Sequence, residues 1–175
     1  MNLLVIILLV LAGIVALLFI IALLMKRKHY VKREMLINAP RQKVFDYIKL
    51  LQNQETFNTN AMADADRKKE FRGTDGTVGY VYAWSGNKNA GEGEKEIINI
   101  VEGQSVEMEI RFVKPIKTSA RILMQLESFT GDQTKVSWSN AGTLNYPLNL
   151  LIPMMQKHVV RDMDKSLATL KSILE

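Results

Sequence analysis

The sequence predicts an α+β fold in which a curved antiparallel β-sheet wraps around a long C-terminal helix, preceded by one transmembrane helix. Three observations support this: an apolar run at the N-terminus, a long central stretch with apolar residues at every second position, and a C-terminal apolar stripe of helical period. We expect a transmembrane anchor at residues 1–25, a basic juxtamembrane flank at residues 26–33 and one folded domain at residues 34–175.

The first element is the apolar run from Leu3 to Met25, which contains no charged side chain. As a helix it would extend roughly 34 Å, enough to cross the hydrocarbon core of a bilayer. No Lys or Arg precedes the run and no small-residue cleavage site ends it, so an uncleaved anchor is favoured over a signal peptide. Ala12 and Ala16 form a small-xxx-small pattern that permits weak self-association of such helices.

Basic residues follow the apolar run directly: Lys26, Arg27, Lys28, Lys32 and Arg33. The positive-inside rule then places the N-terminus outside and the domain in the cytoplasm, as a single-pass protein of the inner or plasma membrane. We expect the flank to rest on anionic headgroups. The other 18 of the 23 Lys and Arg balance the 18 Asp and Glu, so the net charge of +5 belongs to the flank. The neutral domain argues against a nucleic-acid partner.

A strand, a helix and a run of short strands are predicted next. Tyr30 to Asn38 alternates apolar and polar residues, and Asn38-Ala39-Pro40 is a typical helix start. From Lys68 the pattern has period two, most clearly from Val106 to Val113, where one face is apolar and the other polar. Turn signals such as Thr74-Asp75-Gly76 separate these runs, which predicts an antiparallel meander of about six strands.

Gly86, Gly91 and Gly93 form the densest glycine cluster and raise the question of a nucleotide site. A phosphate-binding loop leads from a strand directly into a helix. This cluster instead lies between two extended runs, Gly79 to Trp84 and Glu92 to Val101. It therefore predicts a hairpin turn from Gly86 to Gly91, with Gly93 as a bulge at the start of the next strand.

The last element is a long helix with one apolar stripe, formed by Leu148, Ile152, Met155, Val159, Met163, Leu167, Leu170 and Leu174. Pro153 lies near the beginning of this pattern, so the helix either begins there or bends. A helix with such a stripe must pack on an apolar surface, and the one-sided sheet is the available partner.

This order of elements resembles the START–Bet v 1-like superfamily with its helix-grip fold, and within it the bacterial SRPBCC proteins similar to polyketide cyclases, some of which carry an N-terminal membrane helix. The resemblance is carried by four stretches: Ile37-Asn38-Ala39-Pro40 with Val44-Phe45, Gly79 to Trp84, Gly91 to Glu94 with Ile97, and Thr134 to Trp138. It implies a cavity between sheet and helix for a hydrophobic or amphipathic ligand. The family shares no catalytic constellation, so no catalytic residue is transferred.

The candidate cavity lining is a set of aromatic and apolar residues: Tyr80, Tyr82, Trp84, Met108, Ile110, Phe112, Met124, Trp138, Met155 and Val159. Aromatic residues at strand spacing usually form ordinary core. A single sheet closed by one helix leaves a wide mouth, however, and methionines adapt to irregular spaces. These residues therefore favour a ligand-sized cavity.

Two weak candidates for acid–base chemistry are His158 and Glu96. His158 lies one helical turn before Asp162, which could orient it as a base, but it lies beside the apolar stripe and fits a solvated histidine better. Glu92, Glu94 and Glu96 share one face of a strand, and three unpartnered buried carboxylates would be very costly. A face turned to water is favoured, with Glu96 as the exception nearest to Ile98. With no cysteine and one histidine in the predicted domain, we expect no metal site and no cofactor.

Three functions remain open at this stage. The leading hypothesis is a membrane-tethered binding domain for a hydrophobic or lipid-like small molecule. The alternatives are a cyclase- or hydrolase-like enzyme acting on an apolar substrate and a non-catalytic protein-interaction module.

Overall fold

In the computed structural model, residues 2–62, 64, 66–86 and 91–175 are described. The helices are α1 (Leu3–Leu24), α2 (Arg41–Ile48), α3 (Gln54–Phe57), α4 (Thr59–Met62) and α5 (Ile152–Leu174), with a 3₁₀ turn η1 (Leu148–Leu151) before α5. The strands are β1 (Lys28–Ile37), β2 (Lys68–Arg72), β3 (Val81–Ser85), β4 (Glu92–Val101), β5 (Ser105–Lys114), β6 (Thr118–Thr130) and β7 (Gln133–Thr143).

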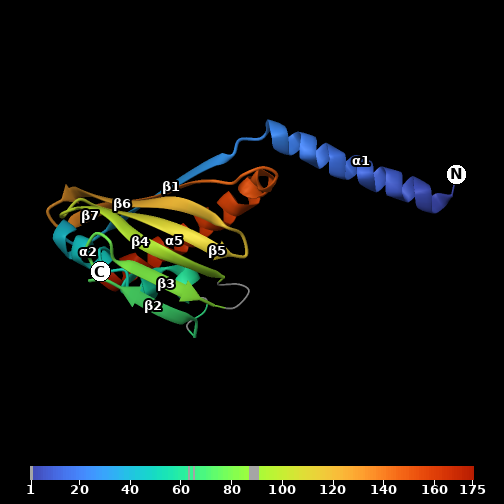
Figure 1. Cartoon of the computed structure of the whole chain (residues 1–175). Coiled ribbons are helices and arrows are strands. Elements are labelled where there is room, and N and C mark those ends of the chain that lie inside the picture. Colours follow the sequence, from blue (N-terminus) through green and yellow to red (C-terminus); the bar gives the residue numbers. More distant parts are fainter. Residues whose placement is uncertain (1, 63, 65, 87–90) are drawn as a thin grey trace.

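Within these ranges the strands form one antiparallel sheet of seven strands in the order β1-β7-β6-β5-β4-β3-β2. Helix α5 lies along one face of this sheet, and the short helices α2 to α4 cover the same side (Figure 1). The predicted α+β fold, with a meander gripping a long C-terminal helix, is confirmed.

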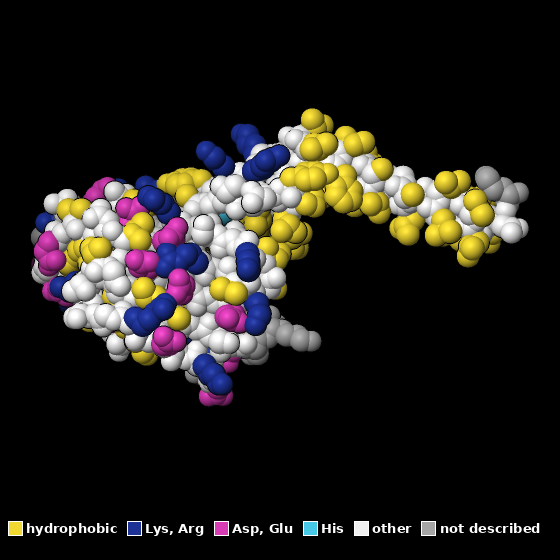
Figure 2. All heavy atoms as spheres, viewed as in Figure 1, with side chains coloured by type: hydrophobic (Ala, Val, Ile, Leu, Met, Phe, Trp, Pro, Cys, Tyr) yellow, Lys and Arg dark blue, Asp and Glu magenta, His cyan; other side chains and the backbone are white. Residues whose placement is uncertain are grey.

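Helix α1 extends away from the domain as an exposed apolar rod (Figure 1). Its length and mean hydropathy of 3.5 are sufficient to cross a membrane. Hydrophobic side chains cover the helix, and Lys and Arg side chains gather where it joins the domain (Figure 2). At its C-terminal end, the buried Asn149 of η1 donates hydrogen bonds to the carbonyl oxygens of Ala22 (2.6 Å) and Met25 (3.1 Å).

The folded sheet begins at Lys28, within the segment that the sequence assigns to the basic flank. Strand β1 pairs with β7 along its whole length, from Lys28 opposite Thr143 to Ile37 opposite Thr134. His29 and Val31 are buried on the inner face, while Tyr30 between them and Lys28 and Lys32 on either side are exposed. The charges of this segment conceal its period-two alternation, because they resemble the membrane flank that precedes them.

The core lies between the inner face of the sheet and the helices. Met163, Leu167, Leu170 and Leu174 of α5 are buried, as expected from the predicted stripe, and Val44, Phe45 and Ile48 are the buried residues of α2. Pro153 occupies the first turn of α5, so the helix begins there and does not bend.

The glycine-rich segment joins β3 to β4 in an antiparallel pair. Gly86 N–H donates to the carbonyl of Gly91 (2.8 Å), and the register shifts between Glu92 and Gly93. The predicted bulge at Gly93 is therefore present. The tip of the predicted hairpin turn, residues 87–90, lies outside the described residues.

Candidate ligand-binding cavity

A cavity of about 320 Å³ lies between the inner face of the sheet, helices α3 and α4, and α5. Its volume is near the lower end of the range for small-molecule sites, roughly 300–1,000 Å³. Most of the wall is apolar or aromatic. The lining consists of His29, Leu51, Gln54, Glu55, Asn58, Asn60, Ala61, Arg67, Tyr82, Trp84, Lys95, Ile110, Phe112, Thr118, Ser119, Ala120, Ile122, Trp138, Asn140, Met155, Val159, Asp162, Met163 and Ser166.

The structure divides the predicted lining residues into two groups. Those that line the cavity are Tyr82, Trp84, Ile110, Phe112, Trp138, Met155 and Val159. Tyr80, Met108 and Met124 point to the same side of the sheet but are buried in the core, away from the cavity. Met108 contacts α3 there, since its sulfur accepts a hydrogen bond from Gln54 (3.2 Å).

One wall of the cavity is a continuous row of aromatic rings. The ring centroids of Tyr82 and Trp84 lie 5.8 Å apart, and those of Trp84 and Phe112 lie 5.9 Å apart in an edge-to-face arrangement. The Trp84 ring lies directly over Gly93, where a Cβ atom would come within 2.9 Å of it. The glycine at the bulge therefore makes room for the indole that forms this wall.

Charged residues gather at the end of the cavity near Tyr82. The carboxylate of Glu55 accepts hydrogen bonds from Arg67 (2.9 Å), Lys69 and the Tyr82 hydroxyl. The guanidinium of Arg67 lies over the rings of Tyr82 and Trp84, at 5.4 and 5.7 Å. Burial alone would raise the pKa of Glu55, but these donors outweigh burial and lower it. Burial, and then the hydrogen bond to Glu55, raise the pKa of Tyr82.

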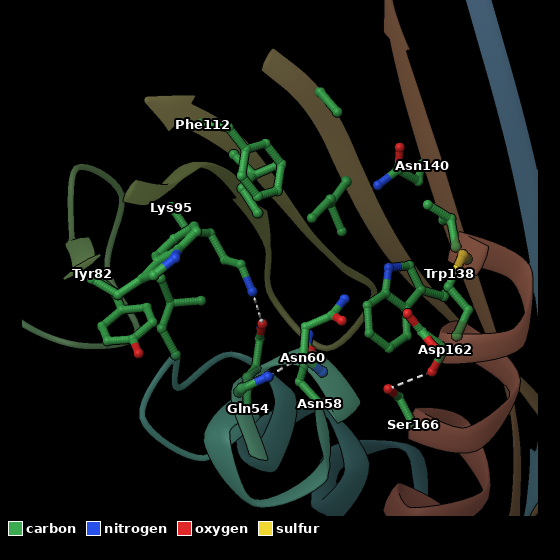
Figure 3. Close-up of a pocket in the computed structure, with 18 of the residues that line it drawn as sticks. Gln54, Asn58, Asn60, Tyr82, Lys95, Phe112, Trp138, Asn140, Asp162 and Ser166 are labelled. Carbon is green, nitrogen blue, oxygen red and sulfur yellow. Dashed lines mark hydrogen bonds between the residues drawn. The ribbon is translucent and has the colours of Figure 1, made fainter. Parts of the chain in front are cut away.

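Lys95 is a charged residue of the cavity wall that the sequence interpretation did not single out. It lies on the inner face of β4, is only 7% exposed, and points into the cavity, where its Nζ donates to Oε1 of Gln54 (3.0 Å; Figure 3). Burial, and then the nearby charge of Arg67, lower its pKa from 10.5 to about 8. The sequence did contain an indication of this position. Side chains alternate between the two faces of a strand, so Lys95 lies on the same face as Ile97 and on the face opposite the glutamates.

The other side of the cavity carries polar groups that have spare hydrogen-bonding capacity. Nε2 of His29 lies 3.2 Å from Oδ1 of Asn140, and the imidazole fits over Gly142, which has no side chain. Nδ1 of His29 and Nε1 of Trp138 are buried without a hydrogen-bond partner among the described residues. Trp138 and Asn140 face the cavity from the side opposite Lys95 (Figure 3). A ligand with polar atoms there would satisfy groups that the protein leaves unpaired.

The two acid–base candidates do not line the cavity. Glu96 lies on the outer face of β4 and pairs with Arg111 (2.6 Å), while Glu94 pairs with Arg111 and Glu92 with Lys114. The three glutamates thus face outward, because each finds a basic partner on the exposed side of the sheet. His158 is exposed on α5, and no hydrogen bond joins it to Asp162 in the described part of the chain.

No group of three or more His, Asp or Glu side chains that could hold a metal ion occurs among the described residues. The polar groups of the cavity are instead scattered donors and acceptors on an apolar wall, which is the usual composition of a site for an organic molecule.

This arrangement of an antiparallel sheet around a long C-terminal helix is the helix-grip fold of Bet v 1-like and SRPBCC proteins. No protein-family model matches the chain, and no curated protein matches it either. Solved structures do match.

Norcoclaurine synthase from Thalictrum flavum, solved with dopamine and hydroxybenzaldehyde, is similar with a TM-score of 0.64 and 11% identity over 89% of this chain and 93% of its own. Ara h 8.0201 has a TM-score of 0.61 and 15% identity over 84% of this chain and 97% of its own. The Aha1 protein from Colwellia psychrerythraea, solved as a dimer, has a TM-score of 0.55 and 16% identity over 84% of this chain and 96% of its own. At these identities the likeness shows the fold alone.

Proposed function

We propose that this protein is a membrane-tethered binding domain for a hydrophobic or lipid-like small molecule. The observation that carries the proposal is the cavity of about 320 Å³, whose wall is mostly apolar and contains both tryptophans of the chain. Similarity in fold to proteins such as norcoclaurine synthase, solved with small molecules bound, supports the same use of the cavity. The two residues that the sequence suggested for proton transfer, Glu96 and His158, do not line the cavity, so they give no support to the enzymatic alternative.

The contact between α1 and the domain supports the membrane tether. Asn149 fixes η1 to the end of α1, and exposed apolar side chains lie beside it, Leu148 and Leu151 on η1 and Met154 in the first turn of α5. The neighbouring Met155 lines the cavity. We propose that α1 crosses the membrane with the N-terminus outside, so that this end of the domain lies close to the bilayer in which apolar ligands dissolve. Association of α1 with a second copy through Ala12 and Ala16 remains a prediction.

Ligand content of the purified protein tests the binding proposal. The full chain would be extracted in polymer-bounded nanodiscs without detergent, and small molecules would be identified by native mass spectrometry. Ala120→Phe fills the cavity from the inner face of β6, whereas Ala141→Phe places the same side chain on the outer face of β7. We expect a bound small molecule in the parent and in Ala141→Phe but not in Ala120→Phe. The same content in all three, or in none, would contradict the proposal.

The absence of cysteine makes the orientation directly testable. Single cysteines at Asn2 and Glu175 would be labelled in intact cells with a membrane-impermeant maleimide. We expect labelling at position 2 only, with labelling at position 175 appearing after lysis. Labelling of position 175 in intact cells would contradict the proposed orientation.

A further inference from the structure

The charge of Lys95 has no use in the binding of a purely apolar ligand. Its Nζ lies at the cavity wall and donates to Gln54, a neutral amide, at 3.0 Å. In the described part of the chain, no carboxylate lies within 4.0 Å of this Nζ. Gln54 itself is held in place, because its Nε2 donates to the carbonyl of Ile48 (3.1 Å). A buried ammonium with only a neutral partner is costly, since nothing replaces its lost hydration in full.

The charged groups around Lys95 leave this end of the cavity positive. Glu55 is the nearby carboxylate, but Arg67 and Lys69 both pair with it and the Tyr82 hydroxyl also donates to it. Two cations therefore pair with Glu55, and Lys95 adds a third positive charge near them. Nε of Arg67 is also buried without a hydrogen-bond partner among the described residues. Additional donors and excess positive charge thus face the same end of the cavity as Lys95.

Between Lys95 and the polar groups around Asn140, the wall is suited to a hydrocarbon or aromatic body. Ile110, Phe112 and Ile122 contribute from the sheet, and Met155 and Val159 contribute from α5. The other carboxylate of the lining is Asp162, which lies on the side opposite Lys95 and pairs with Arg161 at 3.5 Å (Figure 3). The cavity is therefore positively charged at the end formed by Lys95 and Arg67 and apolar between the sheet and α5. These two features are complementary to an amphipathic anion.

We propose that the cavity takes an amphipathic monocarboxylate, whose carboxylate pairs with Nζ of Lys95 and whose apolar part lies between the sheet and α5. The inference rests on the proposed binding function and names the chemical class of its ligand. A carboxylate would convert the half-satisfied ammonium into a buried, hydrogen-bonded ion pair. A neutral head would leave the charge unpaired, and a cationic head would be repelled by Lys95 and Arg67.

Because Lys95 titrates near neutral pH, binding of a carboxylate should be accompanied by a measurable uptake of protons. With a pKa of about 8, Lys95 is mostly protonated at neutral pH and largely neutral one unit above that pKa. A bound carboxylate favours the protonated form and raises the pKa. Binding above that pKa must therefore take up a proton, whereas binding of a neutral analogue must not. Arg67 opposes protonation and Glu55 assists it, and both are present in either state.

The test uses three probes of equal chain length: octanoate, octanol and octylamine. Each would be titrated against the full chain in nanodiscs, with empty nanodiscs as the blank and the fluorescence of Trp84 and Trp138 as the signal. At neutral pH we expect octanoate to bind roughly tenfold more tightly than octanol, and octylamine to bind most weakly. Calorimetry slightly above the pKa of Lys95, in buffers of different ionisation enthalpy, should show proton uptake with octanoate alone.

Lys95→Met should remove the preference for octanoate while octanol still binds. Lys135→Met is the matched control, because Lys135 lies on the outer face of β7 and pairs with Glu127 at 2.7 Å. Equal binding of octanoate and octanol to the parent, a preference that persists in Lys95→Met, or absence of proton uptake would overturn the monocarboxylate inference and leave the apolar cavity standing. Failure of all three probes to bind would overturn the proposed function itself. The proton-uptake measurement needs no variant, so it decides the inference even where Lys95→Met does not fold.

Discussion

Strand β4 carries charge on both of its faces, and the two faces handle it in different ways. On the outer face, Glu92, Glu94 and Glu96 are partly exposed and lie 2.6 to 2.9 Å from basic partners on β5. On the inner face, Lys95 is 7% exposed, and the one hydrogen bond found for it in the described part of the chain goes to a neutral amide. Exposed pairs of the first kind contribute about 0–1 kcal/mol each, whereas an unpaired buried charge is a net cost.

This difference teaches where function should be sought on the sheet. The outer charges are compensated within the protein and need no ligand. The inner charge lies at a cavity wall and donates to a neutral amide, and the ligand proposed above would supply the opposite charge. For locating a binding site, the single base on the inner face is therefore more informative than the three acids on the outer face.

The largest expected effect comes from the apolar neighbour of Lys95. Ile97 is fully buried on the same inner face, so Ile97→Ala should lower the free energy of unfolding by about 2–5 kcal/mol. Glu96→Ala, one residue away on the outer face, should cost about 1 kcal/mol or less. Urea unfolding of the full chain in nanodiscs, followed by tryptophan fluorescence, measures both. Equal losses would show that the two faces of β4 do not differ in burial.

Lys95→Met should stabilise the protein at neutral pH by about 1–3 kcal/mol, despite the lost bond to Gln54. The folded state holds the pKa of Lys95 at about 8, below the ordinary 10.5, so the unfolded chain binds more protons between these values. Stability of the parent should therefore rise with pH across this window, and the advantage of Lys95→Met should shrink over the same window.

The same urea unfolding series, repeated at several pH values, checks this prediction. Lys135→Met serves as the control, since Lys135 is on the outer face of β7. A pH-independent difference between Lys95→Met and the parent would show that Lys95 is not desolvated.

Arg111 organises the outer face, and its removal should have a smaller, salt-dependent effect. Its guanidinium reaches Glu94, Glu96 and Glu109, so Arg111→Gln should cost about 1 kcal/mol by leaving three carboxylates close together. The hydrogen bond from Arg111 lowers the pKa of Glu94, so this contribution is present above pH 4.5 and is lost as the pH falls. Unfolding in low and high salt should show the difference shrinking with salt. A salt-independent cost would contradict the solvated arrangement.

The sequence predicted most of the fold because its strong patterns coincide with single elements. The alternation in Val106 to Val113 corresponds to β5, and the C-terminal stripe corresponds to α5 with its start at Pro153. Gly93 could be assigned to a bulge because two extended runs flank it. In these cases the local sequence pattern and the tertiary packing favour the same secondary structure.

The site was harder to predict because its polar residues contradict the local pattern. His29 was assigned to a membrane flank, since it lies among bases directly after the apolar run. Lys95 lies between glutamates in an apparently solvated strand. The alternation places it on the face of Ile97, but its hydrogen bond to Gln54 at the cavity wall could not be read from the sequence. Gln54 and Glu55 come from α3, a single turn that is too short to show any periodicity.

The smallest expected effect concerns the two residues that sequence reasoning considered for proton transfer. Glu96 points away from the cavity and pairs with Arg111, and His158 is exposed on α5. Neither can contact a ligand held between the sheet and α5, so Glu96→Gln and His158→Ala should each leave octanoate affinity within about twofold of the parent. Lys95→Met, measured in parallel, should lose the preference for octanoate over octanol. A loss of affinity in Glu96→Gln as large as in Lys95→Met would mean that the outer face of β4 communicates with the cavity, and the contrast between its two faces would no longer hold.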